Sequence, residues 1–159
     1  MSLLVRKQLR GTDNLDTPIE AIEPILPYLP HSLWEPAKGR GIMASILREL
    51  GKNVIATTSD FLTTPAPKKV EAIITNPPYS IKTQFLKRAY ELKLPFAFLL
   101  PITALEGIER QRLYAKHGLQ VLFLGRRIDF TGKKAPWFAV AWFTWKLGLP
   151  KDLMFEKKQ

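Results

Sequence analysis

Hydrophobic positions along the chain fall into two patterns, continuous apolar runs and runs with helical spacing. The continuous runs predict strands at residues 33–34, 54–57, 70–75, 96–100, 121–124 and 138–145. Helical spacing predicts helices over residues 19–29, 42–50, 81–92 and 105–116. Strands that alternate with helices are typical of an α/β protein, with a mostly parallel sheet and helices on both faces.

Local signals refine this outline. The segment Thr17-Pro18-Ile19-Glu20 has the form of a capping box with Pro at the first helical position, so we expect Thr17 to cap the first helix. Pro24 and Pro27 are expected to shorten or kink that helix. The loop 59–69 offers little material for a strand, and the link 129–136 is too short for a parallel crossover. We therefore expect six or seven strands, of which the last is antiparallel.

Composition limits the classes of partner and cofactor that the chain can use. The 159 residues include 24 Lys and Arg against 14 Asp and Glu, and the formal net charge of +10 favours nucleic acid over an anionic membrane as the partner. The absence of Cys excludes disulfides, thiolate metal sites and thiol nucleophiles, and with only two His we expect no metal. No apolar run is long enough for a signal peptide or a membrane span, so we expect a cytoplasmic protein.

The turn Asn76-Pro77-Pro78-Tyr79 follows an apolar strand, and ligands of open α/β sheets bind beyond the carboxyl ends of the strands. The side-chain oxygen of Asn76 and the carbonyl of Pro77 are two acceptors in a chain that the prolines stiffen. Together they can bind both hydrogens of a planar –NH2 group and free its lone pair. Tyr79 offers a flat face on which a ring can stack.

A second turn, Glu35-Pro36-Ala37-Lys38-Gly39-Arg40-Gly41, follows the strand at 33–34. Its glycines allow the backbone to approach a ligand, and the next helix offers free N–H groups. It lacks the Gly-Lys-Ser/Thr of a phosphate loop and the third Gly of a dinucleotide fingerprint. Alone, it is equally consistent with a tight turn between a strand and a helix.

With these two turns in one chain, the sequence resembles the S-adenosylmethionine-dependent amino-methyltransferases of the Asn-Pro-Pro-Tyr type. It is most similar to the gamma-order DNA adenine-N6 methyltransferases, in particular small phage-encoded ones. The segments Asp16-Thr17-Pro18, 34–41 and 76–79 occur in the gamma order, and the resemblance covers residues 16–146.

The resemblance implies a single-domain class I methyltransferase fold, Rossmann-like and mostly parallel, with an antiparallel last strand. We accordingly expect a basic amino-terminal arm over 1–15, a catalytic domain over 16–150 and a tail over 151–159, without a separate target-recognition domain. The implied reaction transfers a methyl group from S-adenosylmethionine to the exocyclic amino group of adenine in DNA. It needs no metal, because the sulfonium is already an activated electrophile.

The resemblance also implies roles for individual residues. Thr17, beside Pro18, corresponds to the residue that holds the cofactor's methionine carboxylate, and Glu35 to the one that binds its amino group. The same moiety is lined by Pro36, Ala37, Gly39 and Gly41. Asp60 and Phe61 resemble the segment that contacts the cofactor adenine. Family members usually have an acidic residue for the ribose at the end of the second strand, where this chain has Thr57-Thr58-Ser59; either Asp60 or a hydroxyl serves there.

The target side involves an aromatic residue and several cations. Phe130 resembles the aromatic that, with Tyr79, flanks the flipped base. Expected phosphate contacts lie in or near turns at the carboxyl ends of strands: Lys38, Arg40, Lys82, Arg126, Arg127, Lys133 and Lys134.

Three alternatives stay open. The same tetrapeptide serves enzymes that methylate RNA adenine or a protein glutamine, because each target presents a planar –NH2. The +10 charge favours nucleic acid. A degenerate, non-catalytic DNA-binding module is the third reading, and the chain is compatible with a monomer or a small homo-oligomer. Cytosine carbon-5 methylation is excluded because it needs a Cys nucleophile.

Overall fold

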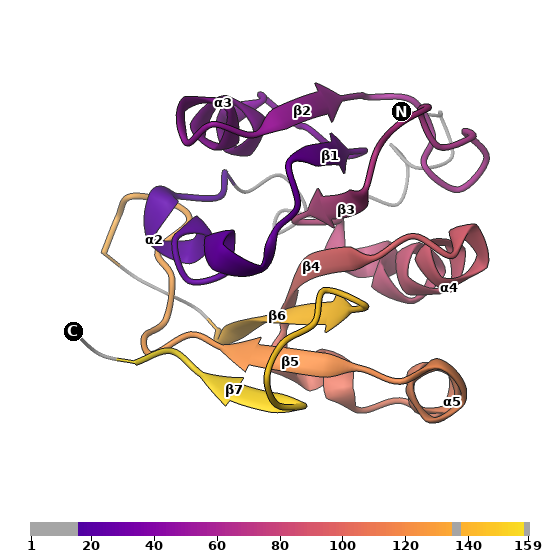
Figure 1. Ribbon diagram of the computed structural model, residues 1–159. Coiled ribbons are helices and arrows are strands. Elements are labelled where there is room, and N and C mark those ends of the chain that lie inside the picture. Colours follow the sequence, from indigo (N-terminus) through magenta and orange to yellow (C-terminus); the bar gives the residue numbers. More distant parts are fainter. Residues whose placement is uncertain (1–15, 135–137, 158–159) are drawn as a thin grey trace.

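The computed structural model describes residues 16–134 and 138–157 and contains one mixed sheet (Figure 1). The arm predicted over residues 1–15 lies outside the described residues, as do 135–137 and 158–159. Within the described part the sheet has seven strands: β1 Ser32–Glu35, β2 Asn53–Ala56, β3 Ala72–Thr75, β4 Phe96–Pro101, β5 Gln120–Phe123, β6 Val140–Trp145 and β7 Leu153–Phe155.

The strand order is β2-β1-β3-β4-β6-β5-β7, with β2 and β7 at opposite edges. β1 pairs in parallel with β2 and β3, and β3 pairs in parallel with β4. β6 is antiparallel to both β4 and β5, whereas β7 is parallel to β5. The predicted sheet, mostly parallel with an antiparallel strand near its end, is therefore confirmed. The short strand β7 was not predicted, and it lies in the segment expected to be a tail.

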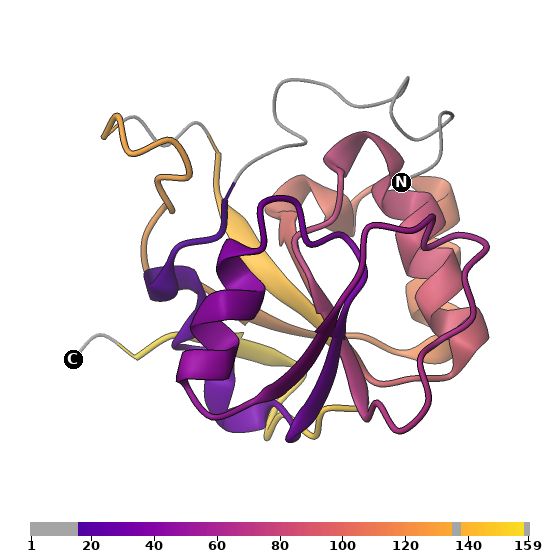
Figure 2. The same ribbon diagram turned by 90° about the horizontal axis from the view of Figure 1, so that it is seen from above.

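Helices cover both faces of the sheet, as predicted (Figure 2). One face carries α2 (Ile19–Ile22) and α3 (Ile42–Glu49), and the other carries α4 (Lys82–Leu92) and α5 (Ile108–His117). The first helix is short, as expected from its prolines, and the chain continues into the 3-10 turn η2 (Leu26–Tyr28). The other 3-10 turns among the described residues are η3 (Tyr79–Ile81) and η4 (Ile102–Leu105). The region 57–71 forms neither helix nor strand, which leaves β2 at the edge.

Strand β4 shows why the central strands are apolar throughout. Phe96, Phe98 and Leu100 belong to the hydrophobic cluster on the α4 side. Ala97 and Leu99, which alternate with them, belong to the cluster on the α2 and α3 side. A strand buried on both faces therefore has apolar residues at every position. Such burial fixes its register, because a shift of one residue would exchange the two faces.

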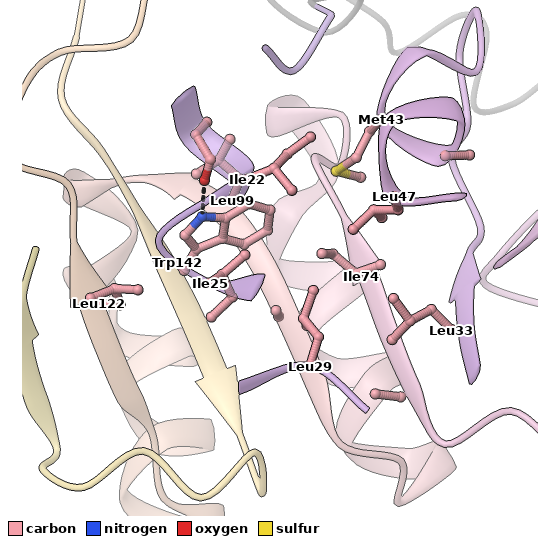
Figure 3. Packing of buried hydrophobic residues seen from close by; sticks show 14 of the residues in the cluster. Ile22, Ile25, Leu29, Leu33, Met43, Leu47, Ile74, Leu99, Leu122 and Trp142 are labelled. Carbon is pink, nitrogen blue, oxygen red and sulfur yellow. Dashed lines mark hydrogen bonds between the residues drawn. The ribbon is translucent and has the colours of Figure 1, made fainter. Parts of the chain in front are cut away.

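Trp142 of β6 joins the sheet to α2. Its ring is fully buried, and its Nε1 donates a hydrogen bond of 2.6 Å to the carbonyl oxygen of Ala21. Figure 3 shows this bond beside Ile22 and Leu99. The contact fixes α2 against the sheet, and Thr17 lies immediately before that helix.

Trp142→Phe is expected to lower the free energy of unfolding by about 1–3 kcal/mol, because the buried Ala21 carbonyl loses its donor. Urea unfolding monitored by circular dichroism measures this loss. Trp145→Phe is the matched control on the other face, since Trp145 donates to the His117 carbonyl nearer to solvent. A loss for Trp142→Phe no greater than that for the control would contradict the anchoring role of Trp142.

Candidate active site

The candidate site lies at the carboxyl ends of β1 and β3, which are neighbouring parallel strands. Glu35 is the last residue of β1, and Thr75, the last residue of β3, directly precedes Asn76. The Thr75 hydroxyl donates a hydrogen bond of 2.6 Å to Oε1 of Glu35, and both side chains are buried. The sheet thus brings the two turns with candidate chemistry together, although 40 positions separate the bonded residues in sequence.

Glu35 is a buried carboxyl group. Its Oε1 accepts hydrogen bonds from the Thr75 hydroxyl and from the backbone N–H of Ala37, the latter at 2.8 Å. Burial raises the pKa of Glu35 to about 8, since the loss of hydration outweighs the two hydrogen bonds that lower it. The carboxyl is therefore mostly protonated at neutral pH, and a cation placed beside it would favour its ionised form.

The turn between β1 and α3 is tight, and it borders open space. The Gly41 N–H donates to the Lys38 carbonyl at 2.7 Å, and Gly41 itself is the N-cap of α3. Gly39 and Gly41 have φ values of +52° and +82°, which side chains rarely adopt. A Cβ atom at either position would meet no atom within 4 Å. These glycines therefore border open space as well as forming the turn.

Thr17 does not cap α2, so the predicted capping box is wrong. The N-cap of α2 is Pro18, without a side-chain hydrogen bond. Oγ1 of Thr17 instead accepts a hydrogen bond of 3.2 Å from Nδ2 of Asn76. The Thr17 hydroxyl therefore has a long-range partner in place of the local one, and this bond connects the turn 76–79 to the segment before α2. The other amide atom of Asn76, Oδ1, is buried and accepts no hydrogen bond from the residues that the structure describes.

The structure connects Tyr79 to the segment that contains Phe130 through a residue the sequence did not single out, Phe138. The Tyr79 ring meets Phe138 edge to face, with centroids 5.6 Å apart, and Phe138 stacks on Phe130 at 6.1 Å. Tyr79 is 8% exposed, so in this conformation a base can contact only a small part of its ring. The one sequence signal for Phe138 was its place at the start of an aromatic strand.

The segment around Phe130 is organised by Asp129. Its carboxylate accepts hydrogen bonds from the backbone N–H groups of Thr131, Gly132 and Lys134 and from the Thr131 hydroxyl. Desolvation raises the pKa of Asp129, but these hydrogen bonds outweigh it and hold the pKa below its ordinary value. The carboxylate thereby fixes a turn from which the side chains of Lys133 and Lys134 project into solvent.

The other expected phosphate contacts differ in their surroundings. Lys38, Arg126 and Arg127 are exposed. Arg40 is also exposed but forms an ion pair with Asp16, and the Lys82 ammonium donates to the Tyr79 carbonyl at 3.2 Å. The side chain of Glu156, next to β7, accepts from the Gly125 N–H at 2.8 Å and so holds the turn before Arg126.

The residues expected to contact the adenine and the ribose of the cofactor already have partners within the protein. Phe61 is 2% exposed and packs against Trp34 and Phe85 in the hydrophobic core, so little of its ring is left for a ligand. Oδ1 of Asp60 accepts from the Leu62 N–H at 3.1 Å, and the Thr57 hydroxyl accepts from Nε1 of Trp34 at 3.0 Å. The roles of Asp60, Phe61 and Thr57 stay predictions.

Among residues 16–134 and 138–157, no three His, Asp or Glu side chains are grouped as metal ligands. In the same part of the chain, no helix is long and apolar enough to cross a membrane.

The fold is similar to that of solved methyltransferases, although no protein-family model and no curated protein matches the sequence. The chain resembles the methyltransferase subunit of a type I restriction-modification system from Streptococcus thermophilus, with 13% identity and a TM-score of 0.66. The match covers 96% of this chain and 49% of that subunit, so this chain spans about half its length. It also resembles a protein from Listeria monocytogenes described as a class I S-adenosylmethionine-dependent methyltransferase, with 10% identity, a TM-score of 0.60, and coverage of 95% and 68%.

These likenesses and the sheet topology define the fold as that of the class I methyltransferases, as the sequence predicted. At such low identity they extend to the fold alone.

Proposed function

We propose that this chain binds S-adenosylmethionine and transfers its methyl group to the exocyclic amino group of adenine in DNA. The observation that carries the proposal is the buried Oδ1 of Asn76, which accepts no hydrogen bond from residues 16–134 or 138–157 and lies at the carboxyl end of a central strand, next to Pro77. A buried acceptor without a donor is costly in a folded protein, and such groups are retained where a ligand satisfies them.

The residues around Glu35 fit the methionine end of the cofactor. A buried carboxyl whose pKa lies near 8 favours a cationic neighbour, and the cofactor's ammonium group is one. Gly39 and Gly41 border open space where a substituent can approach the backbone. When bound there, the cofactor supplies a methyl group activated by its sulfonium.

The catalytic turn then acts on the target amine. Oδ1 of Asn76 and the carbonyl of Pro77 accept its two hydrogens, which favours a tetrahedral nitrogen with a free lone pair. The contact with Phe138 orients the Tyr79 ring, and the base contacts the small part of that ring that is exposed. The adenine must leave the helix to reach this turn, at a cost of a few kcal/mol.

The charge of the chain supports DNA over a protein as the target. The net charge is +10, and Arg126, Arg127, Lys133 and Lys134 are exposed beyond the carboxyl end of β5. The similar Streptococcus thermophilus protein is a subunit of a restriction-modification system. Both observations favour a polyanionic duplex as the partner.

The proposal is tested by incubation of the protein with methyl-labelled S-adenosylmethionine and, in separate reactions, plasmid DNA, RNA or a protein mixture. Digestion to nucleosides is expected to give labelled N6-methyldeoxyadenosine. Label in RNA or in glutamine would identify one of the alternative substrates. Calorimetric binding of DNA without any label transfer would identify a binding module.

DNA affinity is expected to fall steeply with salt, with a slope of about −3 to −4 in the logarithm of the association constant against log salt for the four exposed cations. Lys133→Gln together with Lys134→Gln is expected to make this slope shallower by about 2. Lys93→Gln with Lys151→Gln is the control, because both residues are exposed and precede the amino ends of β4 and β7, away from the carboxyl end of β5. An equal change in both double variants would contradict the assigned surface.

A further inference from the structure

The hydrogen bond between Thr17 and Asn76 joins two segments 59 positions apart. Thr17 is 4% exposed, so water competes little for this bond. The bond engages the Nδ2 end of the Asn76 amide, and the Oδ1 end is the buried atom without a donor among the described residues. In this arrangement the Nδ2 end of the amide faces Thr17 and the Oδ1 end faces away from it.

The direction of the amide matters because its two ends have opposite hydrogen-bonding character. Oδ1 accepts hydrogen bonds, whereas Nδ2 donates two. A target –NH2 group is stabilised by an acceptor and opposed by a second donor. An amide turned by 180° would present its donor end to the target, so the turn needs a group that selects one orientation.

Thr17 is placed to hold the amide in the orientation that the structure shows. A hydroxyl has one hydrogen and two acceptor sites, and Oγ1 of Thr17 uses an acceptor site for Nδ2 of Asn76. The hydroxyl hydrogen therefore points away from the amide. The methyl group of Thr17 further restricts rotation about its side-chain torsion, which keeps the oxygen in place.

We propose that Thr17 is the positioning residue for Asn76, whose amide it holds with Oδ1 directed to the target amine. This rests on the proposed methyl transfer. It assigns to Thr17 a part in the chemical step, in addition to the contact with the cofactor that the resemblance implies.

Two substitutions separate positioning from cofactor binding. Thr17→Val removes the hydroxyl with little change in shape, and Thr17→Ser keeps it. At saturating S-adenosylmethionine, kcat for DNA methylation is expected to fall on the order of 10²-fold in Thr17→Val and to stay within about threefold of the unmodified protein in Thr17→Ser. A higher KM for the cofactor with unchanged kcat in Thr17→Val would overturn the proposal.

Thr144→Val is the matched control. Thr144 is fully buried in β6, and its hydroxyl donates a hydrogen bond of 3.0 Å to the Gln120 carbonyl. It lies at the amino ends of β4 and β5, opposite the candidate site. This variant loses a buried hydroxyl as Thr17→Val does, and its kcat is expected to stay unchanged. A similar fall of kcat in both variants would mean that the effect is general destabilisation, and would also overturn the proposal.

A spectroscopic measurement tests the contact even if the proposed methyl transfer fails. The side-chain amide of Asn76, assigned by its loss in Asn76→Ala, is observed by 15N–1H NMR. Its hydrogens are expected to exchange slowly in the unmodified protein and in Thr17→Ser, and at least about tenfold faster in Thr17→Val. Identical amide exchange in all three proteins would overturn the positioning role, whereas failure to label DNA would overturn only the proposed function.

Discussion

Asn76→Ala is expected to lower the rate of methyl transfer by at least about 10²-fold, with the affinity for S-adenosylmethionine within about threefold of the unmodified protein. The substitution removes Oδ1, one of the two acceptors proposed to bind the target amine. The Glu35 carboxyl and the open turn at Gly39 and Gly41 stay intact, so the cofactor keeps its site.

Single-turnover labelling of plasmid DNA measures the rate, and calorimetry measures cofactor affinity. Asn76→Asp is the informative companion, because it keeps oxygen acceptors at the same position while it loses the Nδ2 donor that binds Thr17. Its rate is expected to lie between those of the unmodified protein and Asn76→Ala. Methyl transfer by Asn76→Ala at the rate of the unmodified protein would contradict the proposed role of Asn76.

The sequence predicts the framework of the fold because the central strands have an unambiguous signal. Residues 96–100 are apolar at every position, and the structure buries that strand on both faces. The polar turns follow directly from the strands, so parallel pairing brings Glu35 and Asn76 to the same edge. That edge was predicted from the order of the elements alone.

The sequence does not reveal contacts that depend on distant partners. The segment from Thr17 to Glu20 fits a local capping pattern, yet the Thr17 hydroxyl binds Asn76. The resemblance assigns Phe61 to the cofactor adenine, and the structure adds ring contacts with Trp34 and Phe85 that the sequence does not indicate. Such tertiary contacts become visible only in the folded chain, and the role of Phe61 stays a prediction.

Short elements are missed for a related reason. β7 contains three residues, Leu153–Phe155, and follows the polar pair Lys151-Asp152. Three residues give no measurable periodicity. Pairing with β5 creates the strand, and the bond from Gly125 to Glu156 holds its end.

Glu35→Gln is expected to change stability with pH and to weaken cofactor binding. The pKa of Glu35 is about 8 in the folded protein, against an ordinary value of 4.5. The folded protein therefore keeps a proton that the unfolded chain releases, and its stability falls as pH rises from 4.5 to about 8, by up to about 1.4 kcal/mol per pH unit. Gln does not ionise, and its oxygen can still accept from Thr75 and Ala37.

Urea unfolding of both proteins at several pH values measures this effect. The difference in the free energy of unfolding, Glu35→Gln minus the unmodified protein, is expected to increase through that window and to level off above pH 8. Glu35→Ala is the control for the lost hydrogen bonds, since it removes the acceptor of both Thr75 and Ala37. A difference that stays constant with pH would show that Glu35 does not hold the proton.

The same substitution is expected to weaken S-adenosylmethionine binding by roughly 1.5–3 kcal/mol, because the cofactor's ammonium loses its anionic partner. In the unmodified protein at pH 7, the ammonium is expected to draw Glu35 into its ionised form, so that binding releases a proton from a carboxyl with a pKa near 8. Calorimetry in two buffers of different ionisation enthalpy detects that proton, which is expected to be missing in Glu35→Gln. Equal affinity and equal proton release in the two proteins would show that the buried carboxyl serves only the fold, and the methionine end of the cofactor would then need another site.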